Sequence, residues 1–416
     1  MKRILAVILS CIMLSTLLAG CAQESTPVGS APSEAGETPS SEAAKEPVTI
    51  KIWHETDATI AKTIEDELAK LAPDVVVTVE RKEKMSEALK LVGNDPSSAP
   101  DLYFFAHDKT GLYAQMGILA PITDFIDKSE LADMLPMTVP AGTYKDSLYQ
   151  LPVYFETLLF MYNKALMPEA PKTTDDLLAY MKANTKDGSY GFVEQHSTAY
   201  YSAGWIQGFG GFIINASAEP GLNTPEMVKS VTYHKQFVPY MPADGEYNTV
   251  TTLFKEGKAH SIISGPWLVP DIKAAGIDLG IAPMPVINES GKPITPFSGV
   301  QGVCVLKNAA AKKDAVAAVL RQLAKPDIGI ALAKAANCAP ANTKCYDDPA
   351  ISANEMILAM KETAANVVPM PNVPEMDVMW SVTENMLAAV NKNNGDPQAE
   401  CDKAQKEALD QIAAMQ

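Results

Sequence analysis

The sequence predicts an α/β protein built from two lobes, and three observations support this prediction. Strand-like and helix-like segments alternate along most of the chain, as in sheets whose parallel strands are joined by helices. With 416 residues the chain is too long for one ordinary hydrophobic core. A strand-like run over residues 149–164 is interrupted by one carboxylate, Glu156, which indicates that the chain crosses there between lobes. We expect Glu156 at this hinge, facing a cleft; an exposed position on an edge strand is the alternative.

The composition is that of a soluble globular protein. Hydrophobic residues make up 47% of the chain and charged residues 20%, both ordinary values. The net charge of −16 argues against nucleic acid as a partner, because nucleic-acid binding needs a basic surface. It also disfavours a protein that lies on an anionic bilayer.

The N-terminus has the pattern of a targeting segment. Lys2-Arg3 precede an apolar run over residues 4–18, which is short for a transmembrane helix of about 20 residues. The run closes with Leu-Ala-Gly-Cys, which resembles a bacterial lipobox ending at Cys21; plain cleavage without a lipid is the alternative. We predict a signal peptide over 1–20 and a lipidated Cys21. A flexible tether completes 21–46, since this stretch is rich in Ser, Pro, Glu, Ala and Gly.

The first folded segments form a strand, a helix and a second strand. Val48, Ile50 and Ile52 alternate with polar residues, as in a half-buried strand. Pro73 ends the helical pattern that follows. Such a unit is normally parallel and right-handed. The expected elements of this region are strands over 48–52, 75–79 and 102–105, and helices over 60–71 and 85–92.

The rest of the chain continues the alternation. Residues 171–176 combine Pro, Thr and Asp before an apolar helical pattern, which marks a helix N-terminus. Pro326 divides a long helical pattern into two parts. We expect strands over 191–193, 261–263, 281–285 and 302–306, helices over 314–334 and 355–364, and a final helix pair.

The stretch after the third predicted strand is the strongest candidate for a binding site. In α/β sheets, ligands bind beyond the carboxyl ends of the strands, which is where Asp108 and Lys109 stand, with Phe105 just before them. Sugar hydroxyls donate and accept hydrogen bonds, so they can bond both charges, and the C–H faces of a sugar can lie on an aromatic ring. The combination indicates a carbohydrate ligand.

Other strand ends supply further candidates. Asp57 follows the first strand as a helix N-cap, a ligand contact, or both. Gly265-Pro266 fixes a turn that holds Trp267 at the mouth of a strand. Clustered aromatic residues often form cores, but the adjacent Tyr200 and Tyr201 indicate that one ring faces outward. The candidate ligand-binding residues are Glu55, Asp57, Phe105, Asp108, Lys109, Glu156, Tyr200, Tyr201, Trp267 and Trp380.

Neither the cysteines nor the histidines predict a metal site. Cys304, Cys338, Cys345 and Cys401 contain no C-x-x-C pattern. Cys338 and Cys345 form either a small disulfide loop or two separate buried thiols. The five histidines lack ligand spacing. We therefore expect no metal and no cofactor.

Four motifs stand out between Val48 and the C-terminus. They are Asp101-Leu102 with Ala106-His107-Asp108 and Gly111-Leu112-Tyr113-Ala114-Gln115, Glu156 with Tyr162-Asn163-Lys164, Gly265-Pro266-Trp267, and Pro371-Asn372-x-Pro374-x-Met376 with Trp380. In these motifs the chain resembles a known family, the extracellular solute-binding proteins of carbohydrate ABC importers, and most of all its maltose/maltodextrin-binding members. The Ala-His-Asp loop and the Pro-Asn stretch are specific to maltodextrin-type members. Phe105 stands where that family often has Trp, and Lys109 where it often has Arg.

This resemblance implies a periplasmic-binding-protein-like fold, with a multi-strand hinge and a ligand cleft between the lobes. Lobe 1 would comprise 47–153 and 302–347, and lobe 2 would comprise 154–301 and 348–416. Asp57, Asp108, Lys109 and Glu156 would bond glucosyl hydroxyls. The aromatic candidates Phe105, Tyr200, Trp267 and Trp380 would form a stacking surface.

The implied function is binding without catalysis. A lipid-anchored monomer on the extracellular or periplasmic face of the cell membrane would capture maltose and maltodextrins by hinge closure. It would deliver them to the transmembrane subunits of an ABC permease. Three alternatives stay open: another oligosaccharide as ligand, a sugar sensor or adhesin with the same fold, and a glycoside hydrolase that uses Asp108 and Glu156 as its acid and base.

Overall fold

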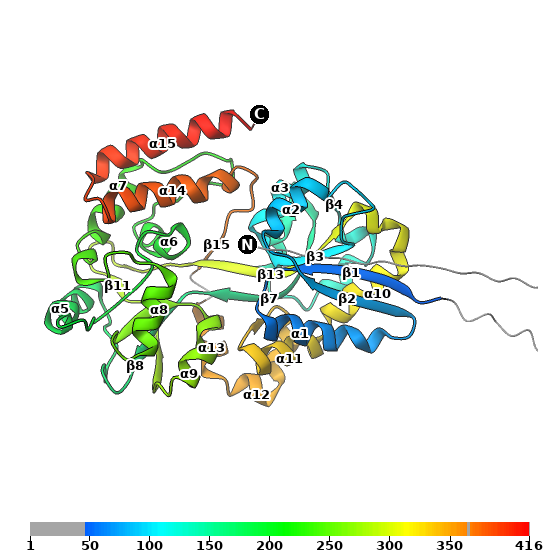
Figure 1. Ribbon diagram of the computed structural model, residues 1–416, viewed down its shortest axis with the longest axis horizontal. Helices are drawn as coiled ribbons and strands as arrows, with labels where there is room; N and C mark the ends of the chain where they lie inside the picture. The colour runs from blue at the N-terminus through cyan, green and yellow to red at the C-terminus, as the bar shows by residue number, and fades with distance from the viewer. Residues whose placement is uncertain (1–45, 364–366, 416) are drawn as a thin grey trace, which may run out of the picture. The chain divides into compact units, whose positions relative to one another are not determined.

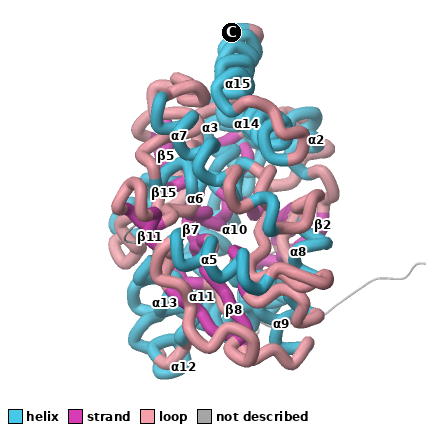
Figure 2. Tube along the Cα trace, turned by 90° about the vertical axis from the view of Figure 1, so that its left-hand side faces the viewer, coloured by secondary structure: helices cyan, strands magenta, loops and turns pink. Residues whose placement is uncertain are grey.

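The computed structural model describes residues 46–363 and 367–415. The predicted signal peptide, Cys21 and nearly all of the tether lie outside these residues. Glu46–Gln416 forms one compact unit by itself. In Figure 2 most of its strands lie inside, with helices and loops around them. The mixed α/β character predicted from the sequence is confirmed.

The larger sheet begins with the predicted strand–helix–strand unit. β1 (Val48–His54) pairs in parallel with β2 (Val75–Arg81) and with β3 (Leu102–Ala106). Between β1 and β2 lies α1 (Ala58–Leu68), which buries Ile60, Ala61, Ile64 and Leu68. α2 (Met85–Val92) precedes β3. The parallel unit and its elements are confirmed, although α1 stops at Leu68 and a single 3-10 turn, Ala69–Leu71, completes the predicted helix.

Two long antiparallel strands extend this sheet. β13 (Phe297–Leu306) lies between β3 and β7 (Gln150–Thr157), and the full order is β14-β7-β13-β3-β1-β2, in which β14 is Ala339–Pro340. Figure 1 shows β13 and β7 running side by side. Because β7 has β14 on one side and β13 on the other, Glu156 does not lie on an edge strand. The edge-strand alternative for Glu156 is therefore wrong.

A smaller antiparallel sheet contains β8 (Leu159–Asn163) between β10 (Leu279–Ala282) and β9 (Ser261–Ser264). β7 and β8 are separated only by Leu158, so the predicted long strand does pass from one sheet into the other. The predicted strand 191–193 is wrong, because Tyr190 and Val193 form only isolated bridges.

Helices surround these sheets. α10 and α11 pack against α1, and α14 packs against α15 and α6, as Figure 1 also shows for α14 and α15. The split of the long helical pattern at Pro326 is confirmed. The remaining helices are α3 (Thr110–Gln115), α4 (Thr138–Ala141), α5 (Thr174–Asn184), α6 (Ala199–Gly208), α7 (Pro225–His234), α8 (Tyr247–Lys255), α9 (Val269–Ala274), α10 (Lys313–Ala324), α11 (Pro326–Ala336), α12 (Pro349–Ser352), α13 (Glu355–Thr363), α14 (Met376–Asn391) and α15 (Pro397–Ala413).

Short strands complete the fold. β4 and β15 pair with β13, while β5 with β6 and β11 with β12 form two small hairpins. Within the described residues, all four cysteines are buried and free, so Cys338 and Cys345 are separate thiols and not a disulfide. These strands are β4 (Leu119–Ala120), β5 (Thr143–Tyr144), β6 (Ser147–Leu148), β11 (Val286–Ile287), β12 (Lys292–Pro293), β14 (Ala339–Pro340) and β15 (Val368–Pro369).

Candidate functional site

The site is built around the carboxyl end of β3, as the sequence predicts. A single 3-10 turn, His107–Lys109, follows β3 and leads into α3. Asp108 is buried, with 8% of its surface exposed. Burial raises the pKa of Asp108, while the charge of Lys109 and a hydrogen bond with Trp380 lower it. Asp108 is therefore a largely desolvated carboxyl group held between a cation and an indole.

His107 fixes the turn that carries Asp108. The amide of Val300 on β13 donates a hydrogen bond to His107 Nδ1 at 3.0 Å. Nδ1 is thus an acceptor, so Nε2 carries the proton and donates to the carbonyl of Met370 at 2.9 Å. Burial lowers the pKa of His107 to about 4. A neutral His107 consequently ties the turn to β13 and to the segment before α14.

Glu156 is the second carboxylate of the site. It is half-buried near the end of β7, and Gln301 Nε2 on β13 donates a hydrogen bond to its Oε1 at 2.8 Å. Burial raises the pKa of Glu156 to about 7, although the hydrogen bond from Gln301 opposes the shift. A ligand hydroxyl that donates to this carboxylate would stabilise its ionised form.

A series of aromatic rings lies beside the two carboxylates. The Tyr200 ring centre is 6.5 Å from that of Trp267 and 6.5 Å from that of Phe297. Phe297 in turn lies 6.1 Å from Trp380. These spacings fall within the range of favourable aromatic contacts. The rings therefore form one continuous series from Trp267 to Trp380, which we call the aromatic series.

The aromatic series and the carboxylates belong to one site. Glu156 pairs with Gly299, two residues from Phe297 on β13. Burial raises the pKa of Tyr200, and the charges of Glu156 and Asp108 raise it further. Tyr201, 5.7 Å from Tyr200 between ring centres, is buried with only 9% exposed. Tyr200 is half-buried, so it is the more exposed ring of the pair.

Trp267 owes its position to the glycine two residues earlier. β9 ends at Ser264, and a 3-10 turn over Pro266–Leu268 follows it. A Cβ at Gly265 would lie 2.1 Å from the Trp267 indole. Only glycine leaves room for the indole to fold back over the backbone at this position. The Gly-Pro-Trp sequence thus places an aromatic ring at the end of β9.

Two other predicted residues, Glu55 and Asp57, form hydrogen bonds within the protein itself. Glu55 accepts hydrogen bonds from the amides of Lys84 at 3.0 Å and Met85 at 3.3 Å, so it caps the start of α2. Asp57 is exposed and caps α1 by accepting from the amide of Thr59 at 2.7 Å. The capping alternative for Asp57 is confirmed, while ligand contact by Glu55 or Asp57 stays a prediction.

Phe105 and Lys109 complete the predicted set. Phe105 is half-buried and packs against the same hydrophobic cluster as Tyr200 and Trp380. Lys109 Nζ lies 2.7 Å from Asp377 Oδ1 and 3.8 Å from Asp108 Oδ2. The ammonium group of Lys109 therefore contacts a carboxylate that the sequence did not single out.

Three residues of this site were missed by sequence reasoning: Phe297, Gln301 and Asp377. The predicted strand 302–306 began too late, because Gly299 and Gln301 interrupt the apolar pattern of β13. A detectable signal existed for Asp377, which stands three residues before Trp380 and shares one side of α14 with it. The partner of Gln301 lies 145 residues away in the chain and has no local signal.

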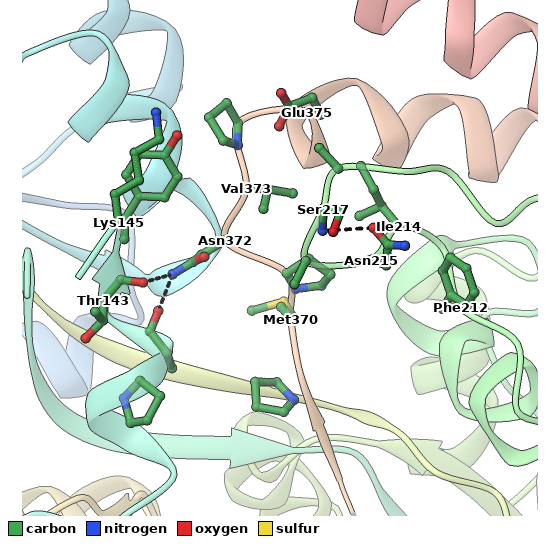
Figure 3. A pocket seen from close by; sticks show the side chains of 18 of the residues that line it. Thr143, Lys145, Phe212, Ile214, Asn215, Ser217, Met370, Asn372, Val373 and Glu375 are labelled. Carbon is green, nitrogen blue, oxygen red and sulfur yellow. Dashed lines mark hydrogen bonds between the residues drawn. The ribbon is translucent and has the colours of Figure 1, made fainter. Parts of the chain in front are cut away.

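A separate groove of about 780 Å³ lies beside the segment that precedes α14. Figure 3 shows Asn372 at its wall, where the side-chain amide donates to the carbonyls of Ala141 and Thr143, each at 2.8 Å. None of the ten predicted site residues lines this groove. The groove and the aromatic series are therefore distinct features.

The fold and the site define a class of protein. The flat rings come from two helices, a strand and a turn, and they are bordered by desolvated carboxyl groups. This arrangement suits a binding protein for a polar solute. The described residues contain no group of three or more His, Cys, Asp or Glu side chains that could hold a metal ion.

The chain belongs to the family of bacterial extracellular solute-binding proteins, whose pattern it matches over residues 63–359. The family predicted from the sequence is thus confirmed. Its members bind solutes for transport and are not enzymes, so the glycoside hydrolase alternative is set aside. Among the described helices, none is both long enough and apolar enough to cross a bilayer.

Individual relatives support the same family. The chain is 30% identical to the maltotriose-binding protein of Pyrococcus abyssi (strain GE5 / Orsay), an alignment that covers 86% of this chain and 82% of that protein. It is 29% identical to the galactooligosaccharide-binding protein of Bacillus subtilis (strain 168), over 100% of this chain and 98% of that protein. The crystal structure of a cyclo/maltodextrin-binding protein complexed with maltotetraose matches with a TM-score of 0.78 at 28% identity, covering 90% of this chain and 100% of that one. The periplasmic-binding-protein-like fold is confirmed by this match.

Proposed function

We propose that this protein captures maltose and maltodextrins, which are α-1,4-linked glucans, and delivers them to an ABC import permease. The observation that carries the proposal is the aromatic series from Trp267 to Trp380 with Asp108 and Glu156 beside it. Rings of this kind offer the apolar faces of glucose units a flat surface, and the carboxylates accept hydrogen bonds from their hydroxyls. A relative that binds maltotriose and a similar structure complexed with maltotetraose support this ligand class.

Closure of two lobes around the ligand is part of the proposal. The lobe boundaries are those expected from the sequence, with lobe 1 over 47–153 and 302–347 and lobe 2 over 154–301 and 348–416. A ligand that contacts both lobes favours the closed state, because it binds that state more tightly than the open one. The transmembrane subunits of the permease would recognise the closed form. The proposed anchor is a lipid on Cys21, followed by the tether.

Galacto-oligosaccharides are the second candidate ligand. They are favoured by one observation, the similarity over the whole chain to a galactooligosaccharide-binding protein. Both sugar classes present hydroxyls and C–H faces, so the same residue types can hold either. The orientation of the hydroxyls relative to Asp108 and Glu156 would decide between them.

Titration calorimetry on the mature protein separates these candidates. Maltotriose, maltotetraose and a β-1,4-galactotriose are injected in turn, with xylobiose as a control sugar. We expect saturable heat from the two glucans and little from the galactotriose or xylobiose. If only the galactotriose binds, galacto-oligosaccharides replace maltodextrins as the proposed ligand. A neighbouring permease gene and an uptake assay in a deletion strain test delivery, because a sensor or adhesin would bind without supporting uptake.

A further inference from the structure

Asp377 connects two cations beside the binding site. Its Oδ1 lies 2.7 Å from Lys109 Nζ, and its Oδ2 lies 2.6 Å from Lys90 Nζ. Lys109 is largely withdrawn from solvent, with 13% of its side chain exposed, and Asp377 has 23% exposed. Burial raises the pKa of Asp377, but the hydrogen bonds from Lys109 and Lys90 outweigh it, and the pKa lies below its usual value. Asp377 is thus an ionised partner of both lysines.

The first two turns of α14 approach both members of the Asp108–Lys109 pair. Asp377 and Trp380 are three residues apart on α14, so they lie on one side of the helix. Asp377 pairs with Lys109, and Trp380 lies close enough to Asp108 to lower the pKa of its carboxyl group. A ligand stacked on Trp380 therefore meets a lysine whose charge is already balanced.

The charges at this edge of the site balance one another. Asp108 and Asp377 carry two negative charges when ionised, and Lys109 and Lys90 carry two positive ones. Without the Asp377 carboxylate, Lys109 would face the ligand with one carboxylate at 3.8 Å and no closer partner among the described ion pairs. A poorly solvated ammonium group without a close partner attracts anions strongly.

We propose that Asp377 is a specificity-determining residue, which occupies the Lys109 ammonium so that the site accepts uncharged sugars and rejects sugars carrying a carboxylate or phosphate. The inference rests on the proposed function, because it concerns the same site and refines the class of sugar that it takes. Asp377 acts through Lys109, so it is a positioning residue and is not itself assigned a contact with the ligand.

The test compares matched neutral and anionic disaccharides on wild type and Asp377→Asn. Maltitol and maltobionate are both acyclic at the reducing end and differ in a carboxylate there, while maltose and maltose 6′-phosphate differ at the other end. We expect wild type to prefer the neutral sugar of each pair. In Asp377→Asn the dissociation constant of the anionic sugar, divided by that of the neutral sugar, should fall about tenfold in at least one pair. Added salt should reduce this change.

Two further variants separate a specific role from a general one. Asp271→Asn removes a carboxylate from another lysine pair, Lys255–Asp271 at 2.9 Å, and changes the net charge equally, so its ratios should equal those of wild type. Lys109→Met combined with Asp377→Asn removes the ammonium as well, and the shift should disappear. Unchanged ratios in Asp377→Asn, or an equal loss of affinity for neutral and anionic sugars, would overturn the inference.

Failure of the proposed function gives a different result. Wild type would then bind neither maltose nor maltitol. The same comparison with lactitol and lactobionate, a matched galactoside pair, would still report on Asp377 if the protein takes galacto-oligosaccharides. A tenfold shift in that pair would retain Asp377 as the specificity-determining residue while replacing the glucan assignment.

Discussion

Acidification should destabilise this protein through His107 by an amount that the structure allows us to estimate. The folded protein holds His107 neutral, with a pKa lowered by burial from 6.5 to about 4. Above pH 6.5 the histidine is neutral in both states, and its buried hydrogen bonds to Val300 and Met370 contribute fully. As the pH falls from 6.5 toward 4, the unfolded chain takes up a proton that the folded protein resists, so the free energy of unfolding decreases. Each unit of pKa difference is worth about 1.4 kcal/mol, so the total loss by pH 4 is about 3 kcal/mol.

Urea unfolding at several pH values between 7 and 4 measures this effect, with His107→Gln as the comparison. Other groups titrate equally in both proteins, so the difference between wild type and variant isolates His107. At pH 7 we expect the variant to be less stable, because it loses at least one buried hydrogen bond. The free energy of unfolding of wild type minus that of the variant should decrease by about 3 kcal/mol between pH 7 and pH 4. A difference that stays constant across this range would refute the neutral, doubly bonded His107.

Three further predictions concern binding and anchoring. Trp267→Ala should weaken maltotriose binding by about 1–3 kcal/mol through lost stacking and burial, measured by calorimetry. Tyr144→Ala, which changes an aromatic residue of the separate groove, is the control; an unchanged affinity in Trp267→Ala would remove Trp267 from the site. The pKa of Glu156 is raised to about 7, so a ligand whose hydroxyl donates to this carboxylate should bind more tightly as the pH rises from 6 to 8. Glu156→Gln should abolish this pH dependence. Binding to wild type that does not depend on pH would argue against the contact. Cys21→Ala should release the protein from the membrane fraction and prevent its labelling by a radioactive fatty acid, and continued labelling would place the lipid elsewhere.

The sequence was sufficient to predict those features that depend on local pattern. The alternation of Val48, Ile50 and Ile52 and the stop at Pro73 define β1, α1 and β2, because strand and helix periodicities differ. The position of Asp108 follows from a general property of α/β sheets, whose ligands lie beyond the carboxyl ends of the strands.

The features that sequence reasoning missed depend on distant contacts. Lys109 and Asp377 are 268 residues apart, so nothing near Lys109 indicates that its charge is balanced. Glu55 likewise caps a helix that starts 30 residues later. The predicted strand 191–193 has suitable residues but no full ladder partner, since only single bridges form there. Local pattern thus identifies candidate side chains, and the tertiary fold decides which of them are already engaged.

The strand β13 has a consequence for how new sugar preferences arise in proteins built like this one. Phe297, Val300 and Gln301 on β13 support the aromatic series, the His107 turn and Glu156. A mutation in this short stretch would disturb three parts of the site at once, which makes it a poor place for gradual change. The first two turns of α14 reach the charged edge of the site through Asp377 and Trp380. We therefore expect single substitutions at these two positions to alter ligand choice while the supporting strand stays intact.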